Sequence, residues 1–227
     1  MTAPTLPSTA VGSPADQPPT EPVRGGAEGH NFAEAPTARR RPGHIVVDAH
    51  GDRFELATDS ATFSPRRLDP GTAFLLDAAP APPPAGTFLD LGCGYGPIAT
   101  VLARDRPEAR VVAVDVNERS RELCARNAAA LGCTNVEVCA PEEVDPSLRF
   151  DLIWSNPQIR IGKEALHDLL LGWLQRLTPE GRAVLVMGRN LGADSMQRWL
   201  GEQGFPTGRL ASKRGYRLLQ VERASDP

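Results

Sequence analysis

The chain has 227 residues, of which 41% are hydrophobic and 23% are charged, a balance typical of a soluble globular protein with one sizeable core. Its formal net charge of −3 argues against a polycation, so any nucleic-acid partner must be held by local basic patches. No apolar run approaches the roughly 20 residues that span a bilayer, and the N-terminus lacks a basic-then-apolar signal pattern, so we expect a cytoplasmic protein without a membrane partner.

The N-terminal part of the chain divides into a tail and a short segment expected to be folded. Residues 1–43 are rich in Pro, Ala, Gly and Thr, cannot bury enough surface to offset the entropy of ordering, and are predicted to form a disordered tail. Residues 44–84 are predicted to form a hairpin and then a helix that begins near Asp69 and Thr72. We expect this segment to pack on the domain that follows, residues 85–223.

The remaining sequence alternates predicted strands and helices. Strands are predicted at residues 87–91, 111–116, 135–140, 150–155 and 181–187. Helices are predicted to begin near Pro97 and to cover residues 118–132, 164–177 and 194–200. A terminal hairpin at residues 209–222 adds an antiparallel strand. Repeated β–α units imply a parallel sheet with right-handed crossovers.

The first predicted strand leads into the most informative stretch of the chain, TFLDLGCGYGPIATVLA. Gly92, Gly94 and Gly96 fall in a turn where backbone N–H groups can approach a ligand without obstruction by a Cβ atom. The Rossmann dinucleotide fingerprint G-x-G-x-x-G does not fit, because Pro97 occupies its third glycine position. Asp90, just before the turn, disfavours a pyrophosphate and favours a cationic or amine-bearing ligand.

Two further polar signals follow other predicted strands. Asp115 lies about 20 residues past the glycine loop, where an acid that holds both ribose hydroxyls is expected; the alternatives are a solvated acid or the N-cap of the next helix. Asn156 precedes Pro157, and its oxygen and a nearby main-chain carbonyl can orient one NH₂ group for attack on a methyl sulfonium. The alternative is an Asn-Pro turn that only closes a strand. Ligands of open α/β sheets bind beyond the carboxyl ends of the strands, so we expect these signals to share one site.

Together these features resemble the class I S-adenosylmethionine (SAM)-dependent methyltransferases, and more narrowly the small-domain enzymes related to the 16S rRNA guanine-N2 methyltransferases. The resemblance spans residues 44–222 and is carried by FSPRRLDPGT (63–72), LDLGCGYGPIA (89–99), VDVN (114–117) and SNPQIRIGK (155–163). It implies an α/β fold with a Rossmann-like, seven-stranded, mostly parallel sheet, one antiparallel strand and helices on both faces. SAM is then expected at the strand ends.

The resemblance also implies roles for individual residues. Asn156 and Pro157 are the expected catalytic pair that holds the target amine. The expected SAM-binding residues are Asp90, Gly92, Cys93, Gly94, Gly96, Asp115, Val116, Asn117, Ala140 and Asn156. At the adenine edge many relatives carry an Asp, and here main-chain groups of Ala140 or the carboxylate of Glu142 are expected to substitute. The expected substrate-binding residues are Gln158, Ile159, Arg160 and Lys163.

RNA is the predicted substrate, with a guanine exocyclic amine of 16S rRNA as the target, and Arg160 and Lys163 follow the catalytic pair where they can contact phosphates. One departure from the family motif is Gln158 in place of a second proline. Ile159 then packs against a base without stacking as an aromatic ring does, which argues against the adenine and protein-glutamine variants. A protein side-chain amide, a small-molecule amine and a SAM-binding module that has lost catalysis stay open as alternatives.

The cysteines and basic clusters complete the sequence expectations. Cys93, Cys124, Cys133 and Cys139 have neither C-x-x-C spacing nor histidine partners at metal spacing, so we predict reduced core residues and no metal site. We expect a monomer. Each basic patch, taken singly, is more typical of a solvated surface than of a binding site; the patches are residues 39–41, 66–67, 160 with 163, and 213–214.

Overall fold

The computed structural model describes residues 1–2, 42–59, 66–157 and 161–223. The strands of its main sheet are β3 (Thr87–Leu91), β4 (Arg110–Val114), β5 (Val136–Cys139), β6 (Phe150–Ser155), β7 (Leu177–Gly188), β8 (Thr207–Lys213) and β9 (Tyr216–Glu222). Their order across the sheet is β5-β4-β3-β6-β7-β9-β8. Strand β9 runs antiparallel to both of its neighbours and all other pairs are parallel, which confirms the expected seven-stranded sheet with one antiparallel strand.

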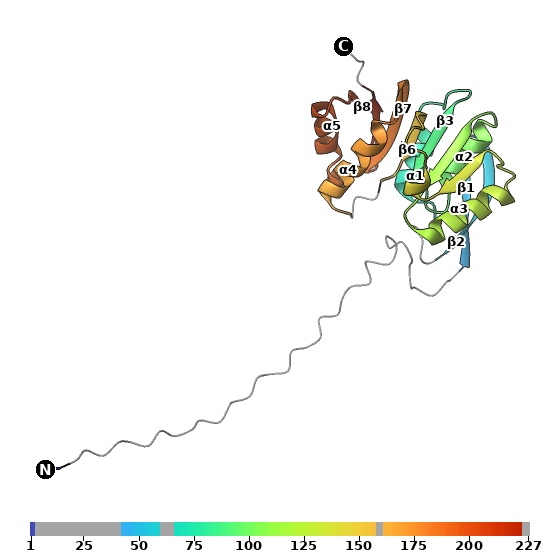
Figure 1. The fold of residues 1–227 in the computed structure, drawn as a ribbon. Coiled ribbons are helices and arrows are strands. Elements are labelled where there is room, and N and C mark those ends of the chain that lie inside the picture. The colour runs from blue at the N-terminus through green and yellow to red at the C-terminus, as the bar shows by residue number, and fades with distance from the viewer. Residues whose placement is uncertain (3–41, 60–65, 158–160, 224–227) are drawn as a thin grey trace.

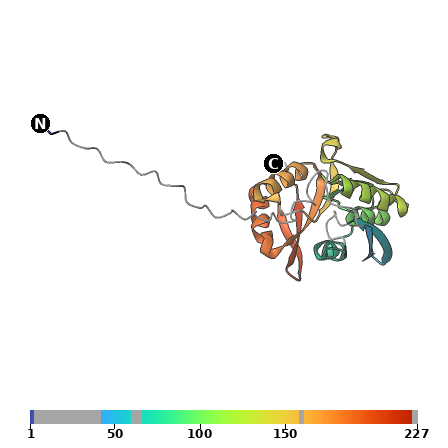
Figure 2. The same cartoon turned by 90° about the horizontal axis from the view of Figure 1, so that it is seen from below.

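Helices cover both faces of this sheet (Figures 1 and 2). They are α1 (Pro70–Ala78), α2 (Pro97–Asp105), α3 (Glu118–Ala130), α4 (Lys163–Leu174) and α5 (Ala193–Glu202), with short 3₁₀ turns at Pro141–Glu143 and Arg189–Leu191. Helices α1, α2 and α3 pack on one face, and α4 and α5 pack on the other. No helix in the described ranges is long and apolar enough to cross a membrane.

Side chains of the sheet strands alternate between two hydrophobic clusters, as expected for strands buried on both faces. On β6, Trp154 packs in the cluster that includes α1, α2 and α3, whereas Ile153 packs in the cluster that includes α4 and α5. Phe88 and Leu89 of β3 divide in the same way. Because both faces are covered by apolar packing, the ends of the strands are the part of the sheet left for polar chemistry.

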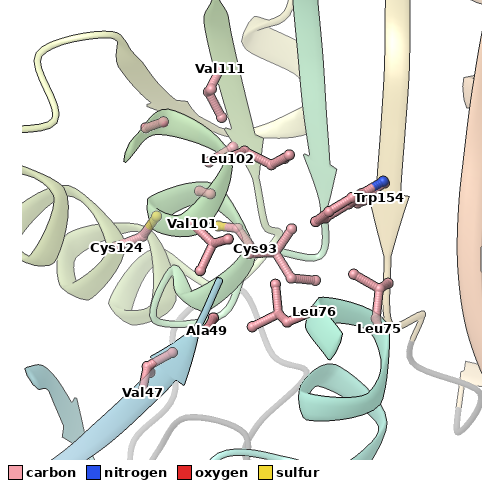
Figure 3. Packing of buried hydrophobic residues seen from close by; sticks show 14 of the residues in the cluster. Val47, Ala49, Leu75, Leu76, Cys93, Val101, Leu102, Val111, Cys124 and Trp154 are labelled. Atoms are coloured by element: carbon pink, nitrogen blue, oxygen red, sulfur yellow. The ribbon is translucent and has the colours of Figure 1, made fainter. Parts of the chain in front are cut away.

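The N-terminal hairpin of β1 (Pro42–Ala49) and β2 (Asp52–Asp59) extends the first of these clusters. Figure 3 shows Val47 of β1 and Leu76 of α1 in the same apolar cluster as Val101 of α2. The Asn127 side chain of α3 adds a polar tie, because it accepts from the N–H of Ala57 and donates to the carbonyl of the same residue. The hairpin and α1 are therefore packed against the helices that follow the glycine loop.

Several predicted boundaries differ from the structure by a few residues, and the end of one helix is the most informative case. The helix predicted at residues 164–177 ends at Leu174, and Leu177 instead begins β7, where it pairs with Phe150 of β6. Leu177 has helical spacing, but strand pairing is what buries it. Between the two elements the guanidinium of Arg176 lies 4.6 Å from the ring centre of Trp173. Trp173 itself is buried beside Phe150.

Two smaller predictions concern the chain start and the cysteines. Strand β1 begins at Pro42, so it includes the last two residues of the predicted tail, and residues 3–41 lie outside the described part. The four cysteines are free, as predicted. Cys93, Cys124 and Cys133 are buried, and Cys139 is half-buried.

Candidate functional site

The glycine loop, Asp115 and Asn156 follow the carboxyl ends of three adjacent strands of the sheet. Strand β3 pairs in parallel with both β4 and β6, and the register sets Leu91 opposite Val114 on one side and Ser155 on the other. The glycine loop follows Leu91 directly, and Asp115 and Asn156 directly follow the other two residues. The three signals therefore start at the same level on adjacent strand ends, where ligands of α/β sheets bind.

The glycine loop is held against β4 and α3 by close contacts, and it has open space beside two of its glycines. The N–H groups of Gly92 and Cys93 both donate to the last carbonyl of β4 at 2.9 Å. Gly96, with φ of +92°, lies so close to α3 that an added Cβ would stand 2.7 Å from Sγ of Cys124. An added Cβ on Gly92 or Gly94 would meet no atom within 4 Å. This arrangement leaves room for a ligand directly against the backbone.

Asp90 lies at the base of this loop and is fully buried. Its Oδ2 accepts a hydrogen bond from the N–H of Ala99 in α2 at 2.9 Å, while its Oδ1 has no partner in the described part of the chain. Burial raises the pKa of Asp90 to about 8; the hydrogen bond from Ala99 opposes the rise and the charge of Asp115 adds to it. Approach of a cationic amine would favour the ionised form of Asp90 and give this unpaired oxygen a partner.

Asp115 is almost fully buried, and each of its oxygens supports the backbone of the site. Oδ2 accepts from the N–H of Gly94 at 2.9 Å and Oδ1 accepts from the N–H of Asn117 at 2.8 Å. Burial raises the pKa of Asp115, and these two N–H groups and the Arg121 cation oppose the rise. The N-cap of α3 is Asn117, which accepts from the N–H of Ser120, so helix capping does not explain Asp115. Each oxygen keeps a further lone pair for a ribose hydroxyl, which stays a prediction.

Asn156 is anchored by its nitrogen. The Asn156 Nδ2 donates to Oδ1 of Asp69 at 2.8 Å and to Oγ1 of Thr72 at 3.0 Å. Asp69 is the N-cap of α1, and the same Oδ1 accepts from the N–H groups of Gly71 and Thr72. Within the described ranges nothing donates to Oδ1 of Asn156. The side chain therefore offers an acceptor at the strand end, next to the glycine loop.

Sequence reasoning placed Asp69 and Thr72 at the start of a helix and gave neither a part in the site. Their contacts with Asn156 join positions 87 and 84 residues apart, which residue spacing cannot reveal. The available signal was the motif FSPRRLDPGT, which carries part of the family resemblance and includes both residues.

The other predicted site residues are distributed around this edge. Val116 is exposed beside Asp115, and Pro157 is buried beside Asn156. Lys163 is exposed at the first position of α4. Predicted residues that lie outside the described part of the chain are Gln158, Ile159 and Arg160.

The segment predicted for the adenine edge is a short turn that begins at Ala140. Ala140 is buried; its N–H donates to Oε2 of Glu143 at 2.6 Å, and its carbonyl accepts from the N–H of the same residue at 3.1 Å. The N–H of Ala140 is thus engaged within the turn, while its carbonyl keeps a second lone pair. That carbonyl and the exposed side chain of Glu142 both stay candidates for contact with an adenine amino group.

Comparison with known proteins shows the family to which the chain belongs. A model described as the methyltransferase small domain matches residues 53–220. The chain belongs to this methyltransferase family. YbxB of Bacillus subtilis is 31% identical over 197 residues, which cover 86% of this chain and 98% of YbxB.

Relatives with an rRNA methyltransferase name share only part of their length with this chain. Ribosomal RNA small subunit methyltransferase C of Pseudomonas aeruginosa is 34% identical over 168 residues, which are 71% of this chain and 49% of that protein. A solved structure described as the T. thermophilus 16S rRNA N2 G1207 methyltransferase in complex with AdoMet and guanosine aligns with a TM-score of 0.61. At 21% identity, covering 80% of this chain and 50% of the other, this likeness shows the shared fold.

Enzymes of this family use SAM, and the described residues fit it. The open space beside two glycines of the loop leaves room for a ligand, and the unpaired Oδ1 of Asp90 suits an amine. Asp115 has lone pairs for ribose hydroxyls next to that loop. The chain is therefore a SAM-dependent methyltransferase whose individual SAM contacts stay predictions.

Proposed function

We propose that the chain is an N-methyltransferase that acts on the exocyclic amine of a guanine in small-subunit rRNA. The observation that carries the proposal is the orientation of the Asn156 side chain. Both of its N–H groups are occupied by Asp69 and Thr72, so its oxygen remains for a target. An acceptor at this place favours a target that donates N–H, such as an amine or an amide.

The proposed chemistry relies on positioning. When bound, SAM would supply a methyl group on a sulfonium, whose carbon accepts the lone pair of the target nitrogen while the C–S bond breaks and its electron pair stays on sulfur. Oδ1 of Asn156 and a neighbouring main-chain carbonyl accept the two N–H groups of the target. These bonds turn the nitrogen lone pair toward the methyl group and favour a pyramidal nitrogen. The methylated nitrogen then loses one proton to solvent.

Names of relatives support RNA as the substrate class. Several similar proteins, from Shewanella, Pseudomonas, Serratia and Cronobacter, are named ribosomal RNA small subunit methyltransferase C. Guanosine is part of the solved T. thermophilus complex, and guanine carries an exocyclic NH₂ that matches an acceptor at the Asn156 position. Exposed cations at Arg66 and Lys163 supply candidate phosphate contacts near the ends of α1 and α4.

A protein amide is the second candidate target. The release factor glutamine methyltransferase of Cereibacter sphaeroides is 40% identical over 133 residues, which are 54% of this chain and 44% of that enzyme. A glutamine side chain also presents an NH₂ group, so the orientation of Asn156 serves both substrates. A methyl-transfer assay that offers both classes of acceptor is therefore needed to distinguish them.

The test is transfer of radiolabelled methyl from SAM by the full chain. The acceptors are 30S subunits, 16S rRNA and total cell protein, all from a host that lacks this gene, so that the target sites are unmethylated. We expect label in RNA, mapped to a guanine N2. An Asn156→Ala variant serves as the matched inactive control.

Other distributions of label argue for other functions. Label in protein alone would overturn the RNA proposal in favour of the amide substrate. Label in no acceptor, with SAM still bound by calorimetry, would support a SAM-binding module that has lost catalysis.

A further inference from the structure

We propose that Asp69 and Thr72 are positioning residues that hold the Asn156 carboxamide with its oxygen toward the target nitrogen. The inference rests on the proposed N-methyl transfer and deepens it, because it assigns the selection of N–H-donating targets to the cap of α1. A carboxamide has two ends of nearly equal size, so shape alone does not decide which end faces the substrate. The surrounding hydrogen bonds must decide it.

Asp69 decides which end of the amide faces α1. Its Oδ1 accepts from the N–H groups of Gly71 and Thr72 at 2.8 and 3.0 Å, which commits this oxygen to the acceptor role. The atom of Asn156 at 2.8 Å from it must therefore be the donor, Nδ2. A flipped amide would set two oxygens against each other and lose this bond.

Thr72 engages the second proton of the amide. Its hydroxyl lies 3.0 Å from Nδ2 of Asn156, and Thr72 is almost fully buried, so water does not readily replace it. A hydroxyl alone could donate or accept, but the orientation set by Asp69 makes it the acceptor here. With both protons used inside the protein, the oxygen is the hydrogen-bonding group of Asn156 that remains for a target.

The start of α1 is packed as a firm support for this arrangement. The ring of Tyr216, at the start of β9, lies 3.0 Å from where a Cβ on Gly71 would stand, so the first turn of α1 rests directly on this ring. Burial, and then the charge of Asp69, raises the pKa of Tyr216 and also that of Tyr95 in the glycine loop. Asp69 therefore lies where α1, β6, β9 and the glycine loop meet.

The first experiment compares two substitutions at Thr72 that separate its hydroxyl from its shape. Thr72→Val keeps the shape and removes the acceptor, whereas Thr72→Ser keeps the acceptor and removes a methyl group. We expect Thr72→Val to lower kcat about tenfold with unchanged affinity for SAM, and Thr72→Ser to restore kcat to within about threefold of the wild type. Thr178→Val is the control, because its hydroxyl donates to Asp151 away from the site.

Asp69 can be tested in the same way, with one substitution that keeps an acceptor oxygen and one that removes it. Asp69→Asn retains an acceptor oxygen for both the helix cap and Asn156, so kcat should stay within about threefold of wild type. Asp69→Ala removes both and should lower kcat about a hundredfold, part of which reflects the lost cap. Equal kcat for Thr72→Val and the wild type, or equal losses for Thr72→Val and Thr72→Ser, would overturn the positioning role.

A second readout does not depend on any methyl acceptor. The side-chain NH₂ resonances of Asn156 are assigned by their disappearance in Asn156→Ala, and their exchange with water is then measured by NMR. We expect faster exchange and shifted resonances in Thr72→Val and Asp69→Ala, with no change in Thr178→Val. Unchanged resonances in the first two variants would contradict the inference even if methyl transfer is observed. If the wild-type chain methylates no acceptor but the resonances still change in Thr72→Val and Asp69→Ala, the positioning role is supported and the proposed function is rejected.

Discussion

The two halves of the site are built over very different distances along the chain. The glycine-loop half is held by near neighbours: Asp90 and Ala99 are 9 residues apart, and Gly94 and Asp115 are 21 apart. The target half depends on Asn156 reaching residues 84 and 87 positions away. The first half is therefore encoded in a local pattern, whereas the second exists only after α1 has packed against the sheet.

The two halves also differ in how they use carboxylates. Asp90 and Asp115 are buried and their pKa values are raised, because burial disfavours their ionised forms. A cationic ligand bound to the glycine-loop half would stabilise those ionised forms. Asp69 instead uses one oxygen to accept three hydrogen bonds. Electrostatics thus dominates one half and hydrogen-bond orientation the other, and variants in the two halves should change different measured quantities.

The largest expected effect separates the halves most sharply. Asn156→Ala removes the acceptor for the target nitrogen and should lower kcat by about 10²–10³, the loss typical of one preorganised transition-state hydrogen bond. Affinity for SAM by calorimetry should not change, because the glycine loop is untouched. Turnover within threefold of wild type would contradict the amine-holding role, and a parallel loss of SAM affinity would contradict the separation of the two halves.

The second prediction concerns stability and pH in the glycine-loop half. Asp90 has a folded-state pKa of about 8, above its unfolded value, so the folded protein holds a proton that the unfolded chain releases. The free energy of unfolding should therefore fall by about 1.4 kcal/mol per pH unit from this group as pH rises from about 4 toward 8. Asp90→Asn should remove this slope, measured by urea unfolding at pH 5 and pH 7 without SAM.

A matched control for that experiment is Asp145→Asn. The pKa of Asp145 is lowered, mainly by hydrogen bonds from Ser147, so its titration lies below the range of pH 5 to 7. This variant should leave the difference in unfolding free energy between the two pH values unchanged. An unchanged difference in Asp90→Asn as well would show that Asp90 does not hold the proton.

The third prediction tests whether Asp115 serves the ligand as well as the backbone. Asp115→Ala removes two expected hydroxyl contacts and should weaken SAM binding about 10- to 100-fold, measured by calorimetry. It also leaves the N–H groups of Gly94 and Asn117 without their acceptor, so the unfolding free energy should drop by about 1–3 kcal/mol. Reduced stability with unchanged SAM affinity would restrict Asp115 to a structural role.

The same contrast in distance explains what the sequence could predict. Apolar runs punctuated by glycine and proline were enough for the strands and for the glycine loop, because those signals are local. The helix boundary at Leu177 was wrong because pairing with Phe150 overrides helical spacing. The bonded main chain of Ala140 and the contacts of Asp69 with Asn156 depend on side-chain directions in the folded chain, which residue order does not specify.

The smallest expected effect concerns Lys163, which is exposed at the first position of α4. A cation there opposes the helix dipole, so Lys163→Gln should stabilise the protein by about 0.3 kcal/mol. If Lys163 contacts a phosphate, the same variant should weaken RNA binding two- to threefold and lower the slope of log K against log salt by about 0.7–0.9. Arg126→Gln, at an exposed position of α3, is the control and should leave this slope unchanged. Opposite signs for stability and RNA binding would identify a residue retained for its substrate, whereas a gain in stability with an unchanged slope would leave Lys163 outside the RNA interface.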